Sequence, residues 1–334
     1  MNRFDVVAAM LRPADLTSKA PIATQEHFAP SNIALCKYWG KRDAELNLPI
    51  NPSLSVSLDH LGTRTRVEAI DGPVDDIWLN GLQMRPDTIF AKRLSRYIDL
   101  FRQGQTQAFR VETRNNIPTA AGLASSASGF AALTRALNDS LQLDLEPAAL
   151  SMLARLGSGS ACRSIYTGFV EWHMGHREDG VDSHAHPIDA KWKGLAIGLI
   201  KVDEGVKSVD SRSGMARTVE SCHLYQSWPL QANTDLVKLH QAIEGQDFTL
   251  FGSTAEQNAL SMHATMIASW PPLVYWQPGS LAAMQKIWAL RQQGLELYFT
   301  MDAGPNLKLL FLEQDRDAVL SHFPDLEIVL PFGS

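Results

Sequence analysis

A stretch of small residues that runs into a helical pattern restricts the fold of this chain more than any other segment. Residues 115–137 begin with turn-forming residues, where Pro118 fixes a φ angle and Gly122 can adopt a positive one. Apolar residues then recur at helical spacing from Leu123 to Leu137. The start of a helix carries unpaired N–H groups that attract anions. The segment therefore predicts either a phosphate-binding helix N-terminus or a helix start that packs closely against its neighbours.

Hydroxyl groups near this helix start favour the phosphate-binding interpretation. The helix dipole contributes only about 0.3–1 kcal/mol per favourable charge, so a polyphosphate needs further partners. Ser125, Ser126 and Ser128 supply hydroxyls in the first turns. The chain has neither a G-x-x-x-x-G-K-[ST] motif nor a G-x-G-x-x-G motif after a strand. A nucleotide bound here would use neither a P-loop nor a dinucleotide-binding fold.

The order of residues 118–127, Pro-x-x-x-Gly-Leu-x-Ser-Ser-Ala, resembles the phosphate loop of the GHMP kinase superfamily. This resemblance implies that ATP is a ligand. The ATP phosphate contacts that it implies come from Pro118, Gly122, Leu123, Ala124, Ser125 and Ser126. It also implies a Mg²⁺ ion that bridges the ATP phosphates, with Ser125 or Ser126 nearby.

Residues 37–51 combine cationic and amide side chains without a regular pattern, so we expect a long loop of the kind that often forms a site. Lys37, Lys41 and the Tyr38 hydroxyl can gather donors around a doubly charged anion, because charge-assisted hydrogen bonds are stronger than neutral ones. A solvated basic loop, with Tyr38 and Trp39 packed beneath it, is the alternative.

Two further segments place an arginine beside serines. Residues 157–164 offer the hydroxyls of Ser158 and Ser160, and Arg163 has a planar guanidinium that fits a carboxylate or a phosphate. Taken alone, this segment is equally compatible with a packing loop and a surface arginine. Ser211 and Arg212 lie at an expected helix start, where an anion is again favoured.

Asp302 begins an Asp-Ala-Gly-Pro-Asn turn between two expected strands, residues 294–301 and 307–312. A carboxylate in such a position can simply cap the turn. The residues alone leave open whether Asp302 has a structural or a chemical role.

These segments, in this order over residues 28–313, resemble the diphosphomevalonate decarboxylase family. Residues 37–41, Lys-Tyr-Trp-Gly-Lys, and residues 158–164, Ser-Gly-Ser-Ala-Cys-Arg-Ser, distinguish that family from the mevalonate-type kinases. The resemblance implies catalytic roles for Lys37, Arg163 and Asp302. The contacts to substrate diphosphate or carboxylate that it implies come from Tyr38, Lys41, Asn47, Ser158, Ser160, Arg163, Ser211 and Arg212.

The reaction implied by this resemblance is the ATP-dependent decarboxylation of mevalonate 5-diphosphate to isopentenyl diphosphate. Asp302 would orient the tertiary 3-hydroxyl, accept its proton late and then stabilise positive charge on the tertiary carbon. A phosphomevalonate decarboxylase, a mevalonate 3-kinase and a non-catalytic nucleotide-binding protein remain alternatives. The full basic set of Lys37, Lys41 and Arg212 favours a diphosphate substrate.

The composition of the chain limits which binding partners and which cellular compartment we expect. A net charge of −6 and a pI near 5.9 argue against a nucleic-acid partner and against a membrane surface, since proteins that bind these carry a basic face. The three cysteines cannot all pair and show no C-x-x-C spacing, which indicates a cytoplasmic protein. The family resemblance implies a homodimer.

A chain of 334 residues exceeds the size at which one core usually divides, so we expect two domains in an α+β fold. Residues 1–193 would form a GHMP nucleotide-binding domain of the ribosomal protein S5 domain 2-like type, with residues 1–25 as an extension. Residues 194–334 would form the second domain. Its expected strand at 194–202, helices within 235–293 and two later strands favour a ferredoxin-like split βαβ arrangement.

Overall fold

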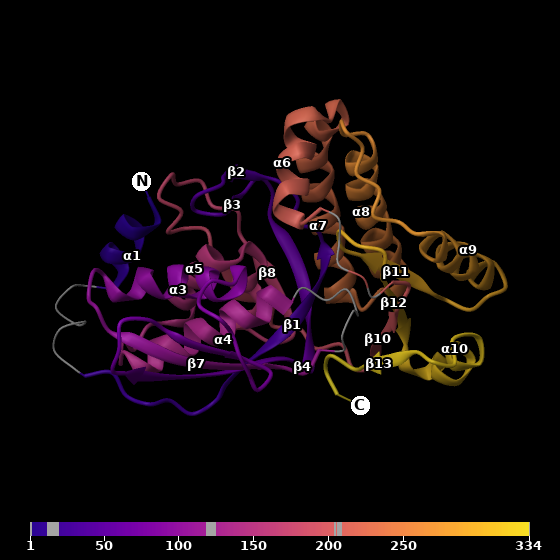
Figure 1. The fold of residues 1–334 in the computed structure, drawn as a ribbon. Helices are drawn as coiled ribbons and strands as arrows, with labels where there is room; N and C mark the ends of the chain where they lie inside the picture. The colour runs from indigo at the N-terminus through magenta and orange to yellow at the C-terminus, as the bar shows by residue number, and fades with distance from the viewer. Residues whose placement is uncertain (1, 12–19, 118–124, 204, 206–208, 334) are drawn as a thin grey trace.

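Two β-sheets with helices packed on them make up this computed structural model, in which residues 2–11, 20–117, 125–203, 205 and 209–333 are described. The first sheet has seven strands in the order β6-β5-β7-β4-β8-β9, with β1 also paired to β4. Its strands are β1 (His27–Cys36), β4 (Ser53–Ile70), β5 (Asp76–Leu79), β6 (Leu82–Gln83), β7 (Ala108–Asn115), β8 (Phe169–Trp172) and β9 (Ala185–Pro187). This part lies on the left in Figure 1, in indigo to magenta.

Strand β4 is the centre of the first sheet, because it pairs with β1, β7 and β8. The alternating apolar residues Val67 and Ala69 predict a strand only over residues 63–70, whereas the strand begins at Ser53. Its first half alternates serines with apolar residues, and both sets are buried. Ser53 and Ser55 accept hydrogen bonds from Arg163, and Ser57 accepts one from the backbone N–H of Gly168.

Helices α3 (Ile89–Arg102), α4 (Ser125–Ser140) and α5 (Pro147–Gly157) belong to this first half of the fold, with a 3₁₀ segment, η1 (Gly159–Ile165), after α5. Helix α3 starts where Thr88 accepts a hydrogen bond from the backbone N–H of Ala91 at 3.2 Å. The sequence predicts a helix over residues 88–102 whose apolar stripe is Ile89, Phe90, Leu94, Ile98 and Phe101. Leu94, Ile98 and Phe101 do face the core, but Ile89 is 88% exposed. The apolar stripe predicted for this helix is therefore wrong in its first turn.

Helix α1 (Arg3–Leu11) lies within the predicted N-terminal extension. Val6, Val7 and Leu11 are buried in the same core as α3 and α5. The side chain of Arg3 forms an ion pair with Glu45 at 2.7 Å. This part of the extension is thus packed onto the first half of the fold.

The second sheet has the order β11-β12-β10-β13, and all its neighbouring strands are antiparallel. Its strands are β10 (Leu195–Ile200), β11 (Tyr298–Met301), β12 (Leu307–Leu312) and β13 (Glu327–Val329). Between β10 and β11 lie α6 (Ser211–Ser221), η2 (His223–Ser227), α7 (Trp228–Gly245), α8 (Phe248–Ile267) and α9 (Pro278–Gln292). Then η3 (Glu313–Asp315) and α10 (Arg316–His322) lead to β13. This order confirms the predicted split βαβ arrangement.

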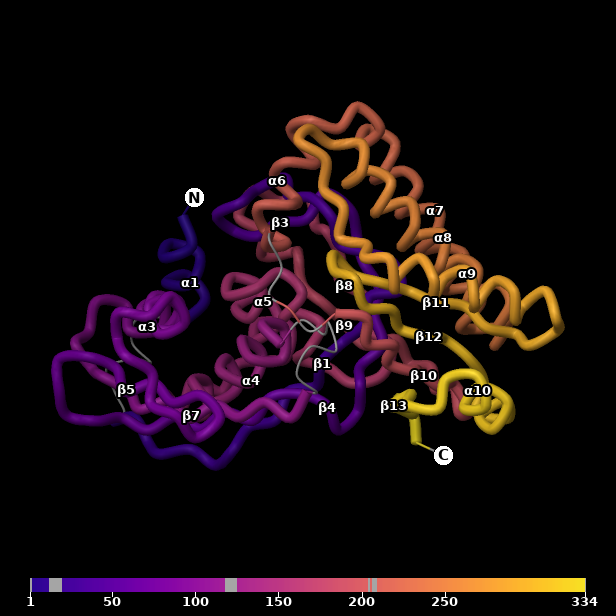
Figure 2. Tube along the Cα trace, turned by 45° about the vertical axis from the view of Figure 1, so that its right-hand side comes forward, coloured from indigo at the N-terminus to yellow at the C-terminus, as the bar shows by residue number. Residues whose placement is uncertain are grey.

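Residues 37–51, which follow β1, join the two halves of the fold (Figures 1 and 2). The carbonyl of Trp39 accepts hydrogen bonds from the Tyr225 hydroxyl at 2.7 Å and from Trp228 Nε1 at 3.0 Å. One apolar core contains residues of both halves, among them Val56 and Phe251. The predicted loop at 37–51 is not wholly irregular, because β2 (Lys41–Asp43) pairs with β3 (Leu48–Pro49). Contacts from both halves therefore fix this segment.

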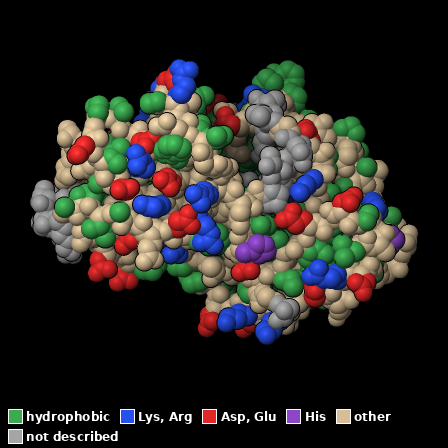
Figure 3. Space-filling view, turned by 60° about the horizontal axis from the view of Figure 1, so that its bottom comes forward, with side chains coloured by type: hydrophobic (Ala, Val, Ile, Leu, Met, Phe, Trp, Pro, Cys, Tyr) green, Lys and Arg blue, Asp and Glu red, His purple; other side chains and the backbone are tan. Residues whose placement is uncertain are grey.

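Charge on the face drawn in Figure 3 is mixed, with Lys and Arg side chains interspersed among Asp and Glu. Among the described residues, none of the helices combines the length and the apolar character needed to cross a bilayer.

Replacing Gly40 tests the packing that holds this junction. Its φ is +106°, and an added Cβ would lie 1.7 Å from the Tyr225 hydroxyl oxygen. Gly294 has a similar φ of +97° but open space around an added Cβ. We expect Gly294→Ala to lose about 1–2 kcal/mol of unfolding free energy from backbone strain. Gly40→Ala should lose about 1–3 kcal/mol more from overpacking. Urea unfolding followed by tryptophan fluorescence measures both, and equal losses would contradict the packing argument.

Candidate active site

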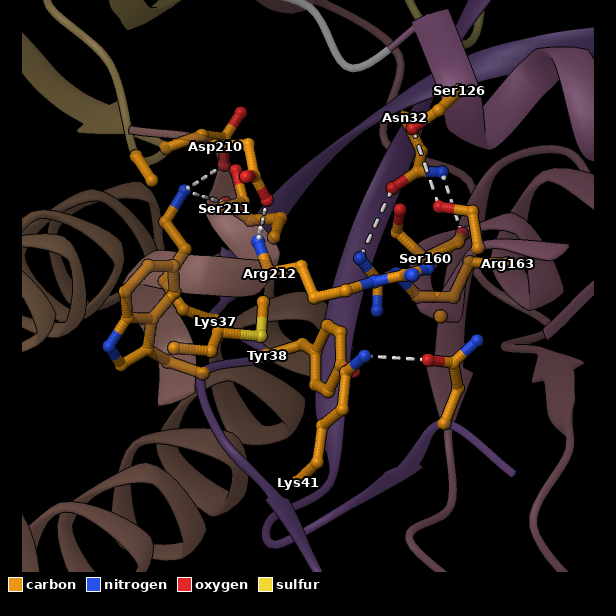
Figure 4. Close-up of a pocket in the computed structure, with 18 of the residues that line it drawn as sticks. Asn32, Lys37, Tyr38, Lys41, Ser126, Ser160, Arg163, Asp210, Ser211 and Arg212 are labelled. Carbon is orange, nitrogen blue, oxygen red and sulfur yellow. Dashed lines mark hydrogen bonds and ion pairs between the residues drawn. The ribbon is translucent and has the colours of Figure 1, made fainter. Parts of the chain in front are cut away.

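A cavity of about 700 Å³ lies between the two halves of the fold and gathers residues from the predicted motifs. All the predicted site residues that lie within the described ranges line it: Lys37, Tyr38, Lys41, Asn47, Ser125, Ser126, Ser158, Ser160, Arg163, Ser211, Arg212 and Asp302. Pro118, Gly122, Leu123 and Ala124 lie outside the described residues. In the view of Figure 4, Lys37, Lys41, Arg163 and Arg212 surround Tyr38.

Asp302 directly follows β11 and is held by two lysines. Lys37 Nζ lies 2.9 Å from Asp302 Oδ1, and Lys308 Nζ lies 3.3 Å from Oδ2. Both lysine side chains are almost completely buried, whereas Asp302 keeps 28% of its side chain exposed. The backbone carbonyl of Asp302 accepts a hydrogen bond from His263 Nε2 at 3.1 Å. The carboxylate is thus anchored from behind and accessible from the cavity.

Lys37 stands at the end of β1 with its backbone and side chain both engaged. Its N–H donates to Asn258 Oδ1 at 2.8 Å, and Asn258 in turn donates to the buried Asp235 at 2.8 Å. Its ammonium group also donates to the carbonyl of Ala34 at 2.7 Å. Burial lowers the pKa of Lys37 to about 8, although the Asp302 carboxylate opposes this shift. Helix α8 therefore fixes the lysine that reaches across to Asp302.

Arg163 lies in η1, and each of its donors contacts a neutral side chain. Its Nε donates to Ser55 at 3.0 Å and its Nη1 to Ser53 at 2.6 Å, both on β4. Its Nη2 donates to Asn32 Oδ1 at 3.3 Å. Burial lowers the pKa of Arg163. The serines of β4 thus orient a buried guanidinium whose charge is suited to a carboxylate ligand.

Lys41 is tied to Asn47 across the β2–β3 hairpin. Lys41 Nζ donates to Asn47 Oδ1 at 2.6 Å, and the Asn47 amide nitrogen donates to the carbonyl of Arg155 at 2.8 Å. The backbone of Asn47 has a φ of +53°, which an asparagine tolerates. Burial, followed by the charge of Arg212, lowers the pKa of Lys41 to about 8.

The Tyr38 hydroxyl is buried and has no hydrogen-bond partner among the described residues. The ring of Tyr38 packs edge-on against Trp172, with centroids 4.7 Å apart. Gly159 allows this approach, since an added Cβ would lie 2.7 Å from the Tyr38 ring. An unpaired buried hydroxyl in a cavity wall indicates a ligand contact.

Two helix starts border the cavity. At α6 the carboxylate of Asp210 accepts hydrogen bonds from the N–H groups of Arg212 and Ser213 at 2.9 and 3.1 Å. A hydrogen bond from the Ser213 hydroxyl lowers the pKa of Asp210. At α4, the Ser126 hydroxyl lies 3.4 Å from that of Ser158, so the second helix start meets the 157–164 segment.

A smaller cavity of about 320 Å³ adjoins the first at the start of α4. Ser125, Ser126 and Arg93 line both cavities. The Arg93 guanidinium lies 4.8 Å from the Phe130 ring centroid and donates to the carbonyl of Gly157 at 3.1 Å. The start of α4 therefore stands between two spaces, in keeping with a site for two molecules.

The sequence motifs did not point to Asn32 and Arg93, which line the cavity. They also did not point to Asn258 and Lys308, which contact Lys37 and Asp302. Arg93 lies on a helix that shows only an amphipathic pattern, and Asn258 lies inside a long apolar helix. Lys308 carried the one available signal, a charge within an otherwise apolar strand.

Two family models and the curated relatives match this chain. A model described as the diphosphomevalonate decarboxylase-like N-terminal domain matches residues 29–185. A model described as the mevalonate 5-diphosphate decarboxylase C-terminal domain matches residues 198–327. The diphosphomevalonate decarboxylase of Aspergillus fumigatus is 39% identical over 314 residues, which cover 87% of this chain and 77% of the relative.

Solved structures show the same similarity. The mevalonate diphosphate decarboxylase of Staphylococcus aureus is 37% identical, with a TM-score of 0.87 over 94% of this chain and 96% of that one. A protein called MDDEF, solved in complex with MVAPP, AMPPCP and magnesium, is 41% identical, with a TM-score of 0.86 over 94% of this chain and 98% of that one. The expected GHMP kinase-like α+β fold is confirmed. Because sequence, fold and gathered motifs agree over most of its length, the chain belongs to the diphosphomevalonate decarboxylase family.

Proposed function

We propose that this chain catalyses the ATP-dependent decarboxylation of mevalonate 5-diphosphate to isopentenyl diphosphate, releasing ADP, phosphate and CO₂. Family membership supports the reaction, and the observation that carries it here is the placement of Asp302. This carboxylate is anchored by two buried lysines in the wall of a cavity lined by cationic and hydroxyl side chains. Such a site suits a reaction in which an acid must face an alcohol while anionic groups are held nearby.

The proposed ligands are mevalonate 5-diphosphate, ATP and Mg²⁺, because the similar protein MDDEF is solved with MVAPP, AMPPCP and magnesium. Hydroxyl oxygens at the start of α4 are of the type that Mg²⁺ accepts, so Ser125 or Ser126 would lie near the ion. Bound there, Mg²⁺ neutralises charge on the ATP phosphates. The ATP phosphate contacts proposed at Pro118, Gly122, Leu123 and Ala124 lie outside the described residues.

The basic and hydroxyl groups of the main cavity form the proposed diphosphate subsite. It comprises Tyr38, Lys41, Ser158, Ser160, Ser211 and Arg212. The Tyr38 hydroxyl, which has no partner among the described residues, and the cations Lys41 and Arg212 favour a multiply charged anion over a neutral ligand. Lys41 is partly desolvated, whereas Arg212 is exposed. Asn47 contributes by fixing Lys41.

Arg163 and Asp302 serve the reacting end of the substrate in this proposal. Arg163 holds the substrate carboxylate, since its own contacts are with neutral side chains. Asp302 orients the 3-hydroxyl and accepts its proton as the phosphoryl group is transferred. The departing phosphate takes up this proton, which restores the Asp302 carboxylate. The carboxylate then stabilises positive charge on the tertiary carbon while CO₂ departs. Lys37 keeps Asp302 ionised and in place.

We also propose that residues 1–193 and 194–334 are separate domains. The strands of the first sheet end at Pro187 and those of the second begin at Leu195. The first matching family model ends at residue 185 and the second begins at residue 198, so the proposed boundary lies between the two. A cytoplasmic location is proposed from three free, buried cysteines. The homodimer implied by the resemblance stays a prediction.

Replacing Asp302 with asparagine tests the central assignment. Asp302→Asn keeps the shape but cannot accept the proton, so kcat should fall by about 10²–10⁴-fold. The dissociation constant for mevalonate 5-diphosphate should not rise, because the diphosphate contacts remain. Kinetics that follow ADP and CO₂ together, with calorimetry for binding, provide the measurement. The exposed Asp325→Asn variant is the control, and wild-type turnover in Asp302→Asn would discard the assignment.

Removing cations from the diphosphate subsite should affect KM more than kcat. Lys41→Ala and Arg212→Ala should each raise KM for mevalonate 5-diphosphate about 10- to 100-fold, because a hydrogen bond to a charged group contributes about 1.5–3 kcal/mol. Arg85→Ala, which removes an arginine that is 81% exposed, provides the control. An unchanged KM in both test variants would refute the subsite.

Alkaline pH should lower kcat/KM, because two lysines of the site lose their charge. Lys37 and Lys41 both have a pKa lowered to about 8 by burial, so each loses its charge as pH rises through that value. We therefore expect kcat/KM, which reports the free enzyme, to fall above about pH 8. Lys41→Arg should remove the contribution of Lys41 to this fall, because an arginine stays charged. A kcat/KM that stays constant up to pH 10 in the wild type would contradict this expectation.

A further inference from the structure

We infer that Lys308 is a positioning residue for Asp302: its ammonium group holds the second carboxylate oxygen and, with Lys37, fixes the acid that faces the substrate alcohol. The inference rests on the proposed function, in which Asp302 accepts the proton. Neither the motifs nor the family resemblance drew attention to this lysine.

Strand alternation places Lys308 on the face of β12 that looks toward the cavity side of the second sheet. Its neighbours Leu307 and Leu309 pack on the opposite face in the core that includes Met284 and Ile287 of α9. The next residue on the Lys308 face, Leu310, belongs to the core shared by both halves. Lys308 is 1% exposed, so its charge sits where an apolar side chain would be expected.

Burial of this ammonium group requires a compensating anion. Taking an ion of this size out of water costs several kcal/mol unless pairing offsets it. The carboxylate of Asp302 is such a partner, with Oδ2 at 3.3 Å from Lys308 Nζ. A leucine would pack on this face without that cost, so packing alone does not explain the lysine.

The two partners are joined by a short, fixed piece of backbone. Asp302 and Lys308 lie six residues apart in the β11–β12 hairpin, in which Thr300 pairs with Lys308. Lys37 reaches the other oxygen from β1 of the first sheet. A carboxylate bonded through both oxygens cannot rotate freely, and one bond comes from its own hairpin. Lys308 therefore sets the orientation of the Asp302 carboxylate, and Lys37 then bonds its other oxygen.

The charged and titratable groups around Asp302 show how Lys308 contributes to the electrostatics of the carboxylate. Lys37 and Lys308 are in contact with the carboxylate, and Arg163 acts on it from farther away. His263 is neutral, because burial lowers its pKa to about 3, and its Nε2 bonds the Asp302 carbonyl and not the carboxylate. Among the described residues, Lys308 thus adds a second cation in contact with the carboxylate beside Lys37, and such a cation favours the ionised form.

Lys308→Met, which keeps an unbranched side chain one atom shorter and removes the charge, tests this role in the full-length chain. We expect kcat to fall about 10- to 100-fold, as misplacement of a reacting group does. KM for mevalonate 5-diphosphate should change little. The acid limb of the kcat–pH profile should move up by about 1–3 pH units, because an opposite charge within contact distance is lost. Lys308→Arg should restore the acid limb toward the wild-type position.

A double-mutant cycle separates positioning from general destabilisation. If Lys308 acts through Asp302, Lys308→Met should cause no further loss of kcat in the Asp302→Asn background. A purely structural role would lower kcat by the same factor in both backgrounds and leave the acid limb in place. Lys201→Met, which removes a half-exposed lysine paired with Glu327, is the matched control for this sheet.

The outcomes distinguish this inference from the proposed function. A wild type that yields no ADP and CO₂ from mevalonate 5-diphosphate overturns the proposed function. An active wild type with unchanged kcat and acid limb in Lys308→Met overturns the inference alone, as does an additive cycle. If Lys308→Met does not fold, Lys308→Gln takes its place in every measurement. Failure of both to fold would assign Lys308 to stability and overturn the inference.

Discussion

The attraction between Asp302 and two buried lysines is the interaction on which the rest of this structure depends. Lys37 comes from the first sheet, whereas Asp302 and Lys308 share a hairpin of the second. The ion pair of Lys37 with Asp302 therefore links the two halves, and the ion pair of Lys308 with Asp302 lies within the second half. Losing one partner of a buried ion pair leaves an uncompensated charge, which typically costs about 3–5 kcal/mol. The geometry of the proposed reaction and the relative placement of the two halves are fixed by the same contacts.

The cavity holds more positive than negative charge, and the chain stabilises the excess with neutral partners. Arg163 is bound by Ser53 and Ser55, and Lys41 is bound by Asn47. Hydrogen bonds to neutral groups orient a cation but leave its charge unbalanced. Burial accordingly lowers the pKa of these groups, and an anionic ligand relieves that penalty. Binding at the remote diphosphate can thus supply energy that holds the reacting end in place.

The sequence predicted the gathered site well because its motifs are local. Small-residue turns and helix starts are specified by adjacent residues, so Ser158, Ser160, Ser211 and Arg212 could be identified without knowledge of tertiary contacts. The split βαβ order could likewise be predicted from element types alone. Arg93 and Asn258 were not predicted as site residues, because helical periodicity indicates which face of a helix is buried but not which residues that face contacts.

One missed half-strand, in β4, and one missed site residue, Lys308, have a common physical origin that itself points to function. The first half of β4 was missed because Ser53, Ser55 and Ser57 weaken the apolar pattern of a buried strand. Lys308 interrupts the apolar pattern of β12 in the same way. Polar residues in buried strands persist only where partners compensate them, and here the partners of Ser53, Ser55 and Lys308 are Arg163 and Asp302. Ser53, Ser55 and Lys308, which interrupt the apolar patterns of these strands, therefore lie where the buried core contacts the proposed catalytic residues.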